Sequence, residues 1–386
     1  MKIKKFTDKN RIKKLLLGAA VCLFALCLAG CGAEPSLPQA NGTVDAVAVA
    51  DKSIAEIDSL IDEYHDNYAV YYPKDDYDDL LESIEGSYVG IGVYIYENEE
   101  NGRVTVLSAM KGGPAYEAGL QPGDEILQVN GEDVTAETTE YVSGKFKSAE
   151  VGSVFDVLIN RPGEGEMHFS IKVEDVQYPT VDSKMLEGYD GIGLIKISSF
   201  NMLTGDQFIS QYEALQKQGM KALVLDLRDN GGGEITSALK IADWFTEKNA
   251  NLMYMVTTEG TYSYYGEEDK HDIPLIVLQN ENTASASEIL LGALQDNQVG
   301  TTLGTLSFGK GIVQNIIPLD SGAGLRYTSS RYLTAGGHEV HKIGITPAIE
   351  YPQPEGTDVY ASHLMEPAKD PQLQKAIEEL QGMLSQ

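Results

Sequence analysis

A serine and a lysine, 25 residues apart, are the two side chains of this sequence best placed to do chemistry together. Ser285 follows a short apolar run, Leu275–Leu278, and precedes apolar residues at helical spacing that continue to Gln295. A buried strand therefore turns into a helix at the serine, where free backbone N–H groups favour negative charge. Lys310 lies between two glycines in Phe308-Gly309-Lys310-Gly311, and we expect its apolar neighbours Phe308 and Ile312 to bury it. A serine hydroxyl is a weak nucleophile that needs a base, and a lysine can be that base when burial lowers its pKa from about 10.4 toward 7–8.

Both motifs also have simpler explanations. Ser285 and Glu288 fit the capping box Ser-x-x-Glu, which most often only begins a helix. A Gly-Lys-Gly segment is usually a turn with a solvated lysine. The local pattern therefore leaves both catalysis and plain structure open.

A glycine-rich turn, Asp229-Asn230-Gly231-Gly232-Gly233, is the third candidate. It follows a strand pattern over 222–228 that is apolar on both faces, and a helix pattern over 235–245 comes after it. Strand, turn and helix in this order are typical of α/β proteins. Neither G-x-x-x-x-G-K-[ST] nor G-x-G-x-x-G is present, so the exposed N–H groups favour an oxyanion hole over a nucleotide site. We expect Asp226 and Arg228 to hold this turn.

The other reactive side chains add no rival site. Six histidines lie outside these motifs: His65, His168, His271, His338, His341 and His363. His338 and His341 have a tolerable metal spacing, but no acidic or thiolate third ligand is near them in the sequence, so neither a metal nor another cofactor is predicted. All three cysteines (Cys22, Cys27 and Cys31) belong to the N-terminal segment, which leaves the body without a disulfide, a thiolate site or a cysteine nucleophile.

Residues 1–30 have the composition of a secretory signal peptide. Seven Lys or Arg residues precede an apolar run, Leu15–Leu28, that is too short for a comfortable transmembrane span. Leu28-Ala29-Gly30-Cys31 looks like a bacterial lipobox, which implies cleavage before Cys31 and a lipid on its sulfur. Residues 31–44 are polar and contain Pro and Gly, as a tether does. We therefore expect an exported protein, lipid-anchored on the outer face of the cytoplasmic membrane.

The charge of the chain excludes one class of partner. The net charge is −29, and because the first thirty residues carry +6, the remainder carries −35. Such an acidic body repels phosphates, so no nucleic acid is expected as a partner. With 386 residues and 42% apolar content, the chain is long enough for two or three domains with a sizeable core.

The middle of the chain changes from helical to strand patterns at Gly86. Helices are expected over 45–68 and 74–85, and Tyr88–Tyr96 has the alternation of one strand. The string GPAYEAGLQPGDEILQVNGEDV follows, with a short helix that begins at Pro114 and an Asn-Gly hairpin. Further helices are expected over 138–147, 205–217 and 370–384, and further strands over 154–160, 167–174, 191–200, 312–319 and 325–333.

Residues 87–176 resemble a PDZ domain of the bacterial protease type. The resemblance implies that Val89, Gly90, Ile91 and Gly92 form the loop that binds a C-terminal carboxylate. The physics suits this role, because glycines let successive N–H groups converge on a carboxylate and an extended peptide can then add to the sheet edge. The same glycines could instead simply shape a hairpin.

Six strings in order make the whole chain from about residue 50 to 385 resemble the C-terminal processing (tail-specific) serine peptidases. They are SYVGIGV, GPAYEAGLQPGDEILQVNG, LVLDLRDNGGG, NENTASASEILLGALQDN, LSFGKGIVQ and GITPAIE. The resemblance implies that Ser285 is the nucleophile, that Lys310 is the general base and that Gln314 orients the lysine. It also implies an oxyanion hole made of the N–H of Ala286 with that of Gly232 or Gly233. Thr283 and Ser307 depart mildly from the family pattern.

The resemblance implies an α/β (α+β) fold in which a crotonase/ClpP-like protease core, residues 177–386, carries the inserted PDZ domain. An N-terminal helical segment, residues 45–86, precedes it. The resemblance also implies a homo-oligomer formed through this N-terminal arm, although the arm is shorter here than is usual in the family.

The implied function is an endopeptidase that cleaves exported proteins after recognising their free C-terminal tails. The alternatives are a catalytically silent PDZ scaffold lipoprotein and a carbohydrate- or nucleotide-acting enzyme on the same scaffold. The presence of both Ser285 and Lys310 disfavours the former, and the lack of a paired-carboxylate motif or a phosphate loop disfavours the latter.

Overall fold

The computed structural model describes residues 66–357 and 365–385. The chain divides into two compact units, of which unit 2 is Gly86–Tyr178 and unit 1 contains the residues on either side of it. Residues 1–65, and with them the expected signal segment, Cys31 and nearly all of the helix expected over 45–68, lie outside the described residues. Within the described stretches, no helix has the length and apolar character needed to cross a membrane.

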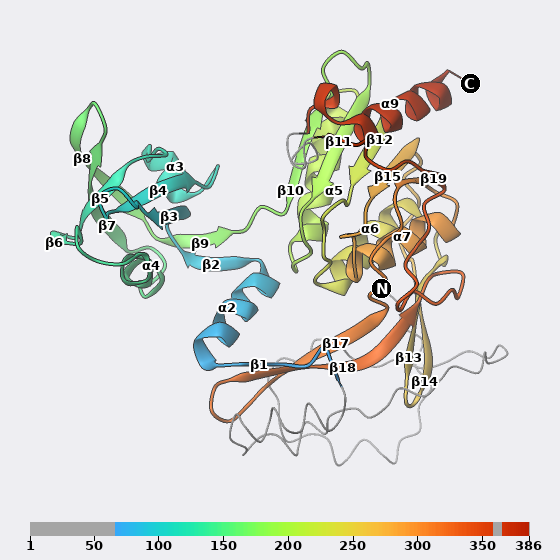
Figure 1. Cartoon of the computed structure of the whole chain (residues 1–386), viewed down its shortest axis with the longest axis horizontal. Coiled ribbons are helices and arrows are strands. Elements are labelled where there is room, and N and C mark those ends of the chain that lie inside the picture. Colours follow the sequence, from blue (N-terminus) through green and yellow to red (C-terminus); the bar gives the residue numbers. More distant parts are fainter. Residues whose placement is uncertain (1–65, 358–364, 386) are drawn as a thin grey trace. The chain divides into compact units, whose positions relative to one another are not determined.

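A six-stranded sheet forms the centre of unit 1 (Figure 1). Its strands lie in the order β10 (Val181–Met185), β11 (Ile192–Ile197), β12 (Ala222–Asp226), β15 (Leu275–Gln279), β16 (Thr301–Gly304) and β19 (Ile349–Glu350). β10 runs antiparallel to β11, and all other neighbours are parallel. Parallel strands of this kind are buried on both faces, which explains the continuous apolar runs in the sequence.

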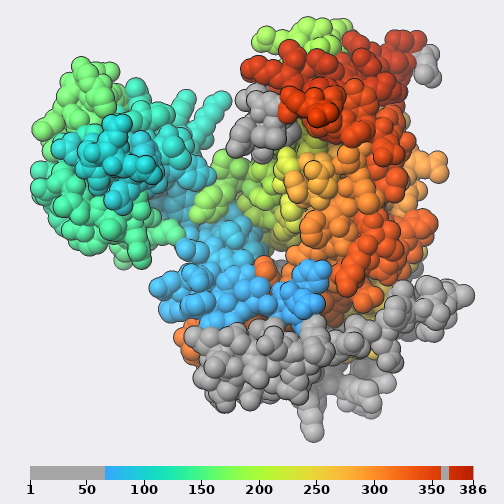
Figure 2. Space-filling view, viewed as in Figure 1, coloured from blue at the N-terminus to red at the C-terminus, as the bar shows by residue number. Residues whose placement is uncertain are grey.

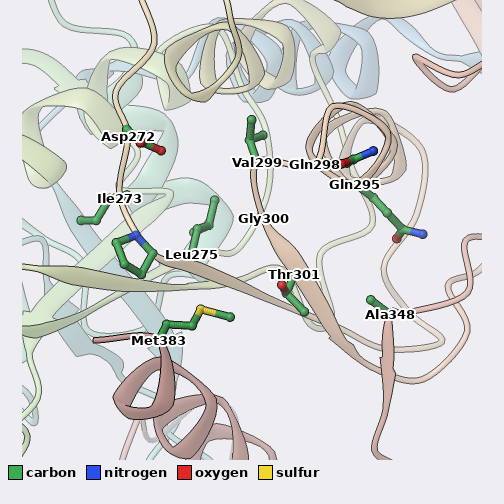
Figure 3. Close-up of a pocket in the computed structure, with 11 residues that line it drawn as sticks. Asp272, Ile273, Leu275, Gln295, Gln298, Val299, Gly300, Thr301, Ala348 and Met383 are labelled. Atoms are coloured by element: carbon green, nitrogen blue, oxygen red, sulfur yellow. The ribbon is translucent and has the colours of Figure 1, made fainter. Parts of the chain in front are cut away.

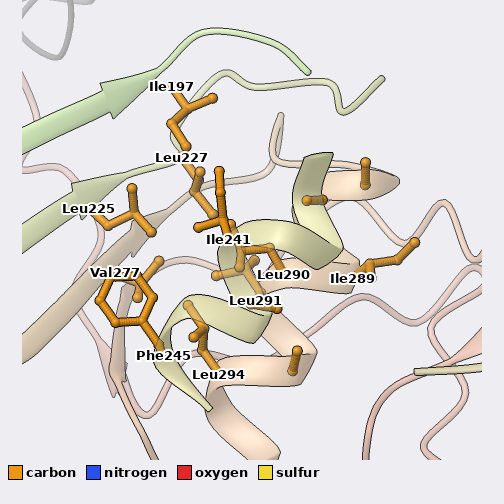
Figure 4. Close-up of a cluster of buried hydrophobic side chains, with 14 of the residues drawn as sticks. Ile197, Leu225, Leu227, Ile241, Phe245, Val277, Ile289, Leu290, Leu291 and Leu294 are labelled. Carbon is orange, nitrogen blue, oxygen red and sulfur yellow. The ribbon is translucent and has the colours of Figure 1, made fainter. Parts of the chain in front are cut away.

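Helices cover both faces of this sheet. On one face, α5 (Thr204–Lys217), α6 (Ile235–Phe245) and α7 (Ala286–Asp296) share a core with Leu225 and Val277. Figure 4 shows the part of this core to which α6 and α7 contribute. On the other face, α9 (Pro371–Leu384) packs on Val224 and Ile276. Successive residues of β12 and β15 thus point to opposite layers, as the period of a strand requires. The α/β fold class expected from the sequence is confirmed.

An antiparallel second sheet in unit 1 is built around β18 (Gly324–Leu333). Its other strands are β1 (Val70–Tyr72), β13 (Asn251–Thr257), β14 (Gly260–Tyr265) and β17 (Ile312–Pro318). β1 pairs with β18 across more than 250 positions of sequence, and in Figure 2 the blue surface of residues 66–85 lies next to orange surface of the C-terminal half. The helix expected over 74–85 is α2 (Lys74–Glu85), whereas the β13–β14 hairpin has no counterpart among the sequence expectations.

Unit 2 has its own core, a ribbon and a larger sheet. β2 (Ser87–Gly90) pairs with β9 (Glu174–Gln177), while β3 (Val93–Glu97), β4 (Val104–Ala109), β5 (Glu125–Val129), β6 (Glu132–Asp133), β7 (Val154–Arg161) and β8 (Gly165–Lys172) form the sheet. The helices are α3 (Pro114–Ala118) and α4 (Thr139–Lys147).

Two details of unit 2 bear on the expectations. The single strand expected over Tyr88–Tyr96 is wrong, because Gly92 has φ +73° and the chain there passes from β2 in the ribbon to β3 in the sheet. The Asn-Gly hairpin is confirmed: Asn130 and Gly131 have φ values of 52° and 78°, as a type I′ turn demands.

Candidate active site

The glycine-rich turn and the serine turn meet at the same edge of the central sheet. They follow β12 and β15, which are parallel neighbours, so their carboxyl ends lie side by side. The carbonyl oxygen of Asn230 accepts hydrogen bonds from the N–H of Ala284 and the hydroxyl of Ser287, both at 3.0 Å. The hydroxyl of Thr283 donates to the carbonyl oxygen of Leu227 (2.9 Å). These bonds fix one turn on the other.

Gly232 brings the backbone of its turn into contact with Ser285. A Cβ at this position would lie 2.6 Å from the carbonyl oxygen of Ala284, 2.8 Å from the N of Ala286 and 2.8 Å from Cβ of Ser285. Gly232 also has φ +95°, a conformation that side chains rarely adopt. Glycine is therefore required here by both space and backbone angle.

Ser285 is the N-cap residue of α7 and has a strained conformation. Its φ of 58° and ψ of −119° lie outside the regions that non-glycine residues favour, at a cost of about 1–3 kcal/mol. Such strain persists when the surroundings impose it, and it is a known property of serine nucleophiles at strand-to-helix turns. The side chain is half-buried between Ala284 and Ala286, which are both buried.

One buried carboxylate, that of Glu288, ties the serine turn to the lysine loop. Its Oε2 accepts the N–H of Ser285 (2.9 Å) and the N–H of Lys310 (2.8 Å). Its Oε1 accepts the N–H of Gly309 (2.7 Å) and the hydroxyl of Ser307 (2.6 Å). Glu288 is fully buried, and four donors replace the water that its charge has lost. The Ser-x-x-Glu motif therefore does more than begin a helix, and Ser307 is part of the same network.

Lys310 is half-buried, and its pKa lies below the ordinary lysine value. Burial is the main cause of the lowered pKa, and the positive charge of Arg326 adds to it. Of the two apolar neighbours expected to bury it, Ile312 is 5% exposed but Phe308 is 59% exposed. The expectation for Phe308 as a burying neighbour is therefore wrong, because that ring points to solvent.

The three predicted oxyanion donors differ in their surroundings. Ala286 is the first residue of α7, where N–H groups lack helical partners. The N–H of Gly232 already donates to Oδ1 of the buried Asn230 (2.9 Å). In the bridge between Phe200 and Gly233, the N–H of Phe200 donates to the carbonyl oxygen of Gly232, and the N–H of Glu234 donates to the carbonyl oxygen of Phe200. The N–H of Gly233 takes no part in this bridge. Gly233 is therefore the better candidate for the second donor.

Gln314 lies in β17 and is fixed by an unexpected partner. Its side-chain amide donates to the carbonyl oxygen of Tyr68 (2.7 Å). The carboxylate of Asp66 holds this segment by accepting from the N–H and the hydroxyl of Thr328 (2.7 and 2.9 Å). Because the amide N of Gln314 is used, its carbonyl oxygen is the group left to accept from a lysine. The orienting role of Gln314 stays a prediction.

Asp226 and Arg228 belong to a buried ion cluster that reaches the C-terminal helix. The guanidinium of Arg228 contacts both carboxylate oxygens of Asp226 (2.9 and 2.7 Å) and of Asp370 (3.0 and 2.6 Å). Nζ of Lys196 lies 3.4 Å from Asp226. Burial alone would raise the pKa of Asp226, but the charges of Arg228 and Lys196 hold it below its usual value. The cluster fixes the end of β12, where the glycine-rich turn begins.

The predicted carboxylate-binding residues of unit 2 lie at the end of β2 and in the turn that follows. Gly90 ends β2, and Ile91 and Gly92 connect it to β3. β3 pairs with β4 on one side and is the edge strand of its sheet. An edge strand presents free backbone groups to which an extended peptide can add. The binding role of Val89, Gly90, Ile91 and Gly92 stays a prediction.

Other parts of the described residues give weaker indications of a functional site. No group of three His, Cys, Asp or Glu side chains there could hold a metal ion, and His338 has Asp296 as its neighbour at 3.9 Å. A cavity of about 560 Å³ lies at the amino ends of β15 and β16, the edge opposite to the serine turn (Figure 3). Its lining includes Leu275, Thr301 and Met383.

Comparison with known proteins assigns families to both units. Residues 191–351 match the profile of Peptidase family S41, and residues 105–161 match that of the PDZ domain. The carboxy-terminal processing protease CtpA of Bacillus subtilis is 32% identical over 305 residues, covering 78% of this chain and 64% of that protein. A carboxyl-terminal-processing protease of Synechocystis sp. is 32% identical over 311 residues, covering 79% and 71%. A solved photosystem II D1 C-terminal processing protease is 29% identical, with a TM-score of 0.47, and covers 80% of this chain and 84% of that chain.

A strained serine at the carboxyl edge of a parallel sheet, tied through one carboxylate to a lysine loop, is an arrangement of the kind that the serine-peptidase class uses. Within that class, the chain belongs to peptidase family S41, among the relatives of the carboxyl-terminal-processing proteases, and it contains a PDZ domain. The family predicted from the sequence strings is confirmed. The match spans 64% of the length of CtpA and 65% of that of a second Bacillus subtilis relative, CtpB.

Proposed function

We propose that this protein is a serine endopeptidase in which Ser285 is the nucleophile and Lys310 is the general base. The observation that supports it most is the shared carboxylate of Glu288, whose Oε2 binds the N–H groups of both residues. The two residues that this carboxylate joins are a strained serine at a helix N-terminus and a lysine whose pKa is lowered. A neutral amine beside a serine hydroxyl is the arrangement that base-assisted acyl transfer needs.

The reaction runs in two steps. Neutral Lys310 takes the proton of the Ser285 hydroxyl while Oγ attacks the carbonyl carbon of the scissile peptide bond. The electron pair of the carbonyl moves onto its oxygen, which the N–H groups of Ala286 and Gly233 stabilise, each by about 3–4 kcal/mol. The C–N bond then breaks, and the Lys310 ammonium gives its proton to the leaving amine. Water, deprotonated by Lys310, finally attacks the acyl carbon; the bond between this carbon and Oγ of Ser285 breaks, and the Lys310 ammonium returns its proton to Oγ.

The substrate class that we propose is exported protein with an apolar, free C-terminal tail. Two features support it: the relatives are named as C-terminal processing proteases, and unit 2 offers the edge strand β3 beside the turn Ile91-Gly92. The tail would add to β3 as a further strand while its carboxylate is held by the N–H groups of the turn.

The test is cleavage of a folded protein that ends in an apolar tail. Ser285→Ala should remove cleavage, because no hydroxyl remains to form the acyl bond. Lys310→Arg should do the same, because arginine stays charged at working pH. Ser321→Ala, in an exposed loop, is the control and should cleave like the wild type. Undiminished cleavage by Ser285→Ala would contradict the proposal, and tail binding without cleavage by the wild type would identify a scaffold.

We further propose that the chain is exported and held at the outer face of the cytoplasmic membrane by lipid on Cys31. The support is the sequence alone, namely a basic segment, an apolar run and a lipobox-like Leu28-Ala29-Gly30-Cys31. Cys31→Ser should move the protein from the membrane fraction to the soluble fraction of cells. An unchanged distribution would overturn the anchor.

A further inference from the structure

The backbones of Ser285 and Lys310 share two hydrogen-bond partners, one for their N–H groups and one for their carbonyl oxygens. Their N–H groups share one carboxylate oxygen of Glu288. Their carbonyl oxygens share one hydroxyl, that of Tyr332, at 3.1 Å for Ser285 and 3.0 Å for Lys310. Tyr332 comes from β18, 47 residues after the serine and 22 after the lysine.

Tyr332 is held rigidly by its own element and by the core. Its backbone pairs with Met255 of β13, and its N–H donates to the carbonyl oxygen of Gly311 (3.2 Å), next to the lysine. The side chain is 1% exposed and belongs to the core shared by α6 and α7. A buried hydroxyl needs partners, and the single hydrogen of this one is shared between the two carbonyl oxygens in a bifurcated bond.

The hydroxyl of Tyr332 remains a donor at any working pH. Burial raises its pKa well above the ordinary tyrosine value, and the negative charge of Glu288 raises it further. A carbonyl oxygen can only accept, so a protonated tyrosine fits this position and a tyrosinate does not.

The Lys310 carbonyl depends on this contact more than the Ser285 carbonyl does. The Ser285 oxygen also accepts the N–H groups of Glu288 (2.8 Å) and Ile289 (3.0 Å). Within the described residues, the Tyr332 hydroxyl is the one donor found for the Lys310 carbonyl. Loss of the hydroxyl would therefore release the lysine loop while the serine keeps two bonds.

We propose that Tyr332 is a positioning residue, whose hydroxyl fixes the peptide group of Lys310 against that of Ser285 and so holds the base in reach of the nucleophile. The proposal rests on the proposed function. Tyr332 is buried and has no access to substrate, so its effect passes entirely through Lys310. A displacement of about 1 Å at such a site can lower the rate by about 10²-fold.

The first test is Tyr332→Phe in the full chain, which keeps the ring and removes the hydroxyl. We expect kcat to fall by about 10- to 100-fold while KM stays within about twofold, because the loss affects the base and not substrate binding. Tyr212→Phe is the matched control. Tyr212 is equally buried in the same core, but among the described residues the one hydrogen-bond partner of its hydroxyl is the side chain of Gln216 (3.5 Å), so the kcat of this variant should stay at the wild-type value.

A second readout is the acidic limb of the kcat profile. Within the described part of the chain, the groups around Lys310 that bear charge or titrate include Glu288 on α7, Arg326 and Tyr332 on β18, His341, which packs on Gly311, and Lys342, whose N–H donates to the carbonyl oxygen of Gly309. Tyr332→Phe leaves the charges of the others unchanged. A released lysine loop becomes better solvated, so the pKa of Lys310 rises and the acidic limb moves to higher pH.

A third measurement separates this proposal from the proposed function. The pKa of Lys310 can be followed by NMR of lysine labelled with 13C at Cε, in the wild type and in Tyr332→Phe, without any substrate. Should the wild type cleave nothing, a higher Lys310 pKa in Tyr332→Phe would still support the positioning role. Wild-type kcat in a folded Tyr332→Phe, or an unchanged Lys310 pKa in an inactive protein, would overturn it.

Rescue guards against a merely structural effect. If Tyr332→Phe folds poorly, p-aminophenylalanine at position 332 restores a donor at the same place on the ring. We expect this variant to recover most of the lost kcat. Recovery of melting temperature without recovery of kcat would overturn the proposal.

Discussion

At the scale of single residues, Gly232 has the strictest requirement. Replacing it with alanine would place a methyl group against the carbonyl oxygen of Ala284 and the N of Ala286, which are rigid backbone atoms. We expect Gly232→Ala to lower the free energy of unfolding by about 1–3 kcal/mol and the rate of cleavage by about 10²-fold. Denaturant unfolding and a cleavage assay measure these effects.

The neighbouring Gly231 is the control for this prediction. No heavy atom lies within 4 Å of a Cβ built there, and its φ is not left-handed. Gly231→Ala should therefore fold and cleave like the wild type. Equal effects of the two substitutions would show that the close approach at Gly232 is not what matters.

Lys310 links activity to stability through its lowered pKa. The folded-state pKa lies below the unfolded value of 10.5, so the unfolded chain binds more protons between the two pKa values and stability rises with pH there. Below that pH window, the lysine is charged in both states, and the full cost of burying its charge lowers the free energy of unfolding. Lys310→Met should thus be inactive but melt at a higher temperature than the wild type at pH 7, with the gain vanishing above pH 10.5.

Lys342 provides the comparison, because it is an exposed lysine in the same region. Lys342→Met should leave the melting temperature at pH 7 nearly unchanged. For the wild type, kcat should rise with pH through the pKa of Lys310, since only the neutral amine is a base. A rate that falls as pH rises through this range would contradict the role of Lys310.

At the scale of elements, the ion cluster of Arg228 joins α9 to the end of β12. Arg228→Met would leave the carboxylates of Asp226 and Asp370 buried with one cation, Lys196, near the first of them. Breaking a buried pair on one side costs about 3–5 kcal/mol, so urea unfolding should show a loss of that size. The exposed pair of Lys240 and Asp206 is the control, and its removal should cost less than about 1 kcal/mol.

Local patterns were sufficient for the elements that carry Ser285 and the glycine-rich turn. The apolar run before Ser285 and the helical spacing after it predict β15 and α7, and the glycine-rich turn after β12 is also predicted. These features depend on neighbours in sequence. The family resemblance then implies that Ser285, Lys310 and the glycines share one site.

Long-range contacts could not be predicted in the same way. Asp370 lies 142 residues from Arg228, and Tyr68 lies 246 residues from Gln314. Nothing in the local sequence of either partner indicates the other, because such pairs form only when distant strands adopt their register. The positive φ of Gly92, which divides β2 from β3, is likewise set by tertiary packing and not by the alternation of its neighbours.

At the scale of the whole molecule, unit 2 is joined to the chain by two connections that lie together. The N–H of Tyr178 donates to the carbonyl oxygen of Gly86 (2.8 Å), and β2 pairs with β9 just inside these ends. Residues 86–178 can therefore be replaced by a short Gly-Ser linker without stretching unit 1. Because each unit has its own core, we expect the shortened chain and the isolated residues 86–178 both to fold. Each should melt within a few degrees of its transition in the full chain.

Cleavage by the shortened protein tests the division of labour between the units. If unit 2 binds the C-terminal tail of the substrate, the shortened protein should no longer distinguish an apolar tail with a free carboxylate from the same tail ending in an amide. The full chain should prefer the free carboxylate. Equal preference in both proteins would show that tail recognition does not reside in residues 86–178.

The protein's own C-terminal segment is held in a helix. Leu373, Ile377 and Leu380 of α9 are buried against the sheet, and Asp370 at its start is bound by Arg228. A binding edge or a cleavage site that accepts extended chain can take this segment only after the helix unwinds and the ion pair separates. Under the proposed function, residues 371–384 of a folded molecule would therefore be protected from cleavage by another copy for as long as helix α9 and its ion pair persist.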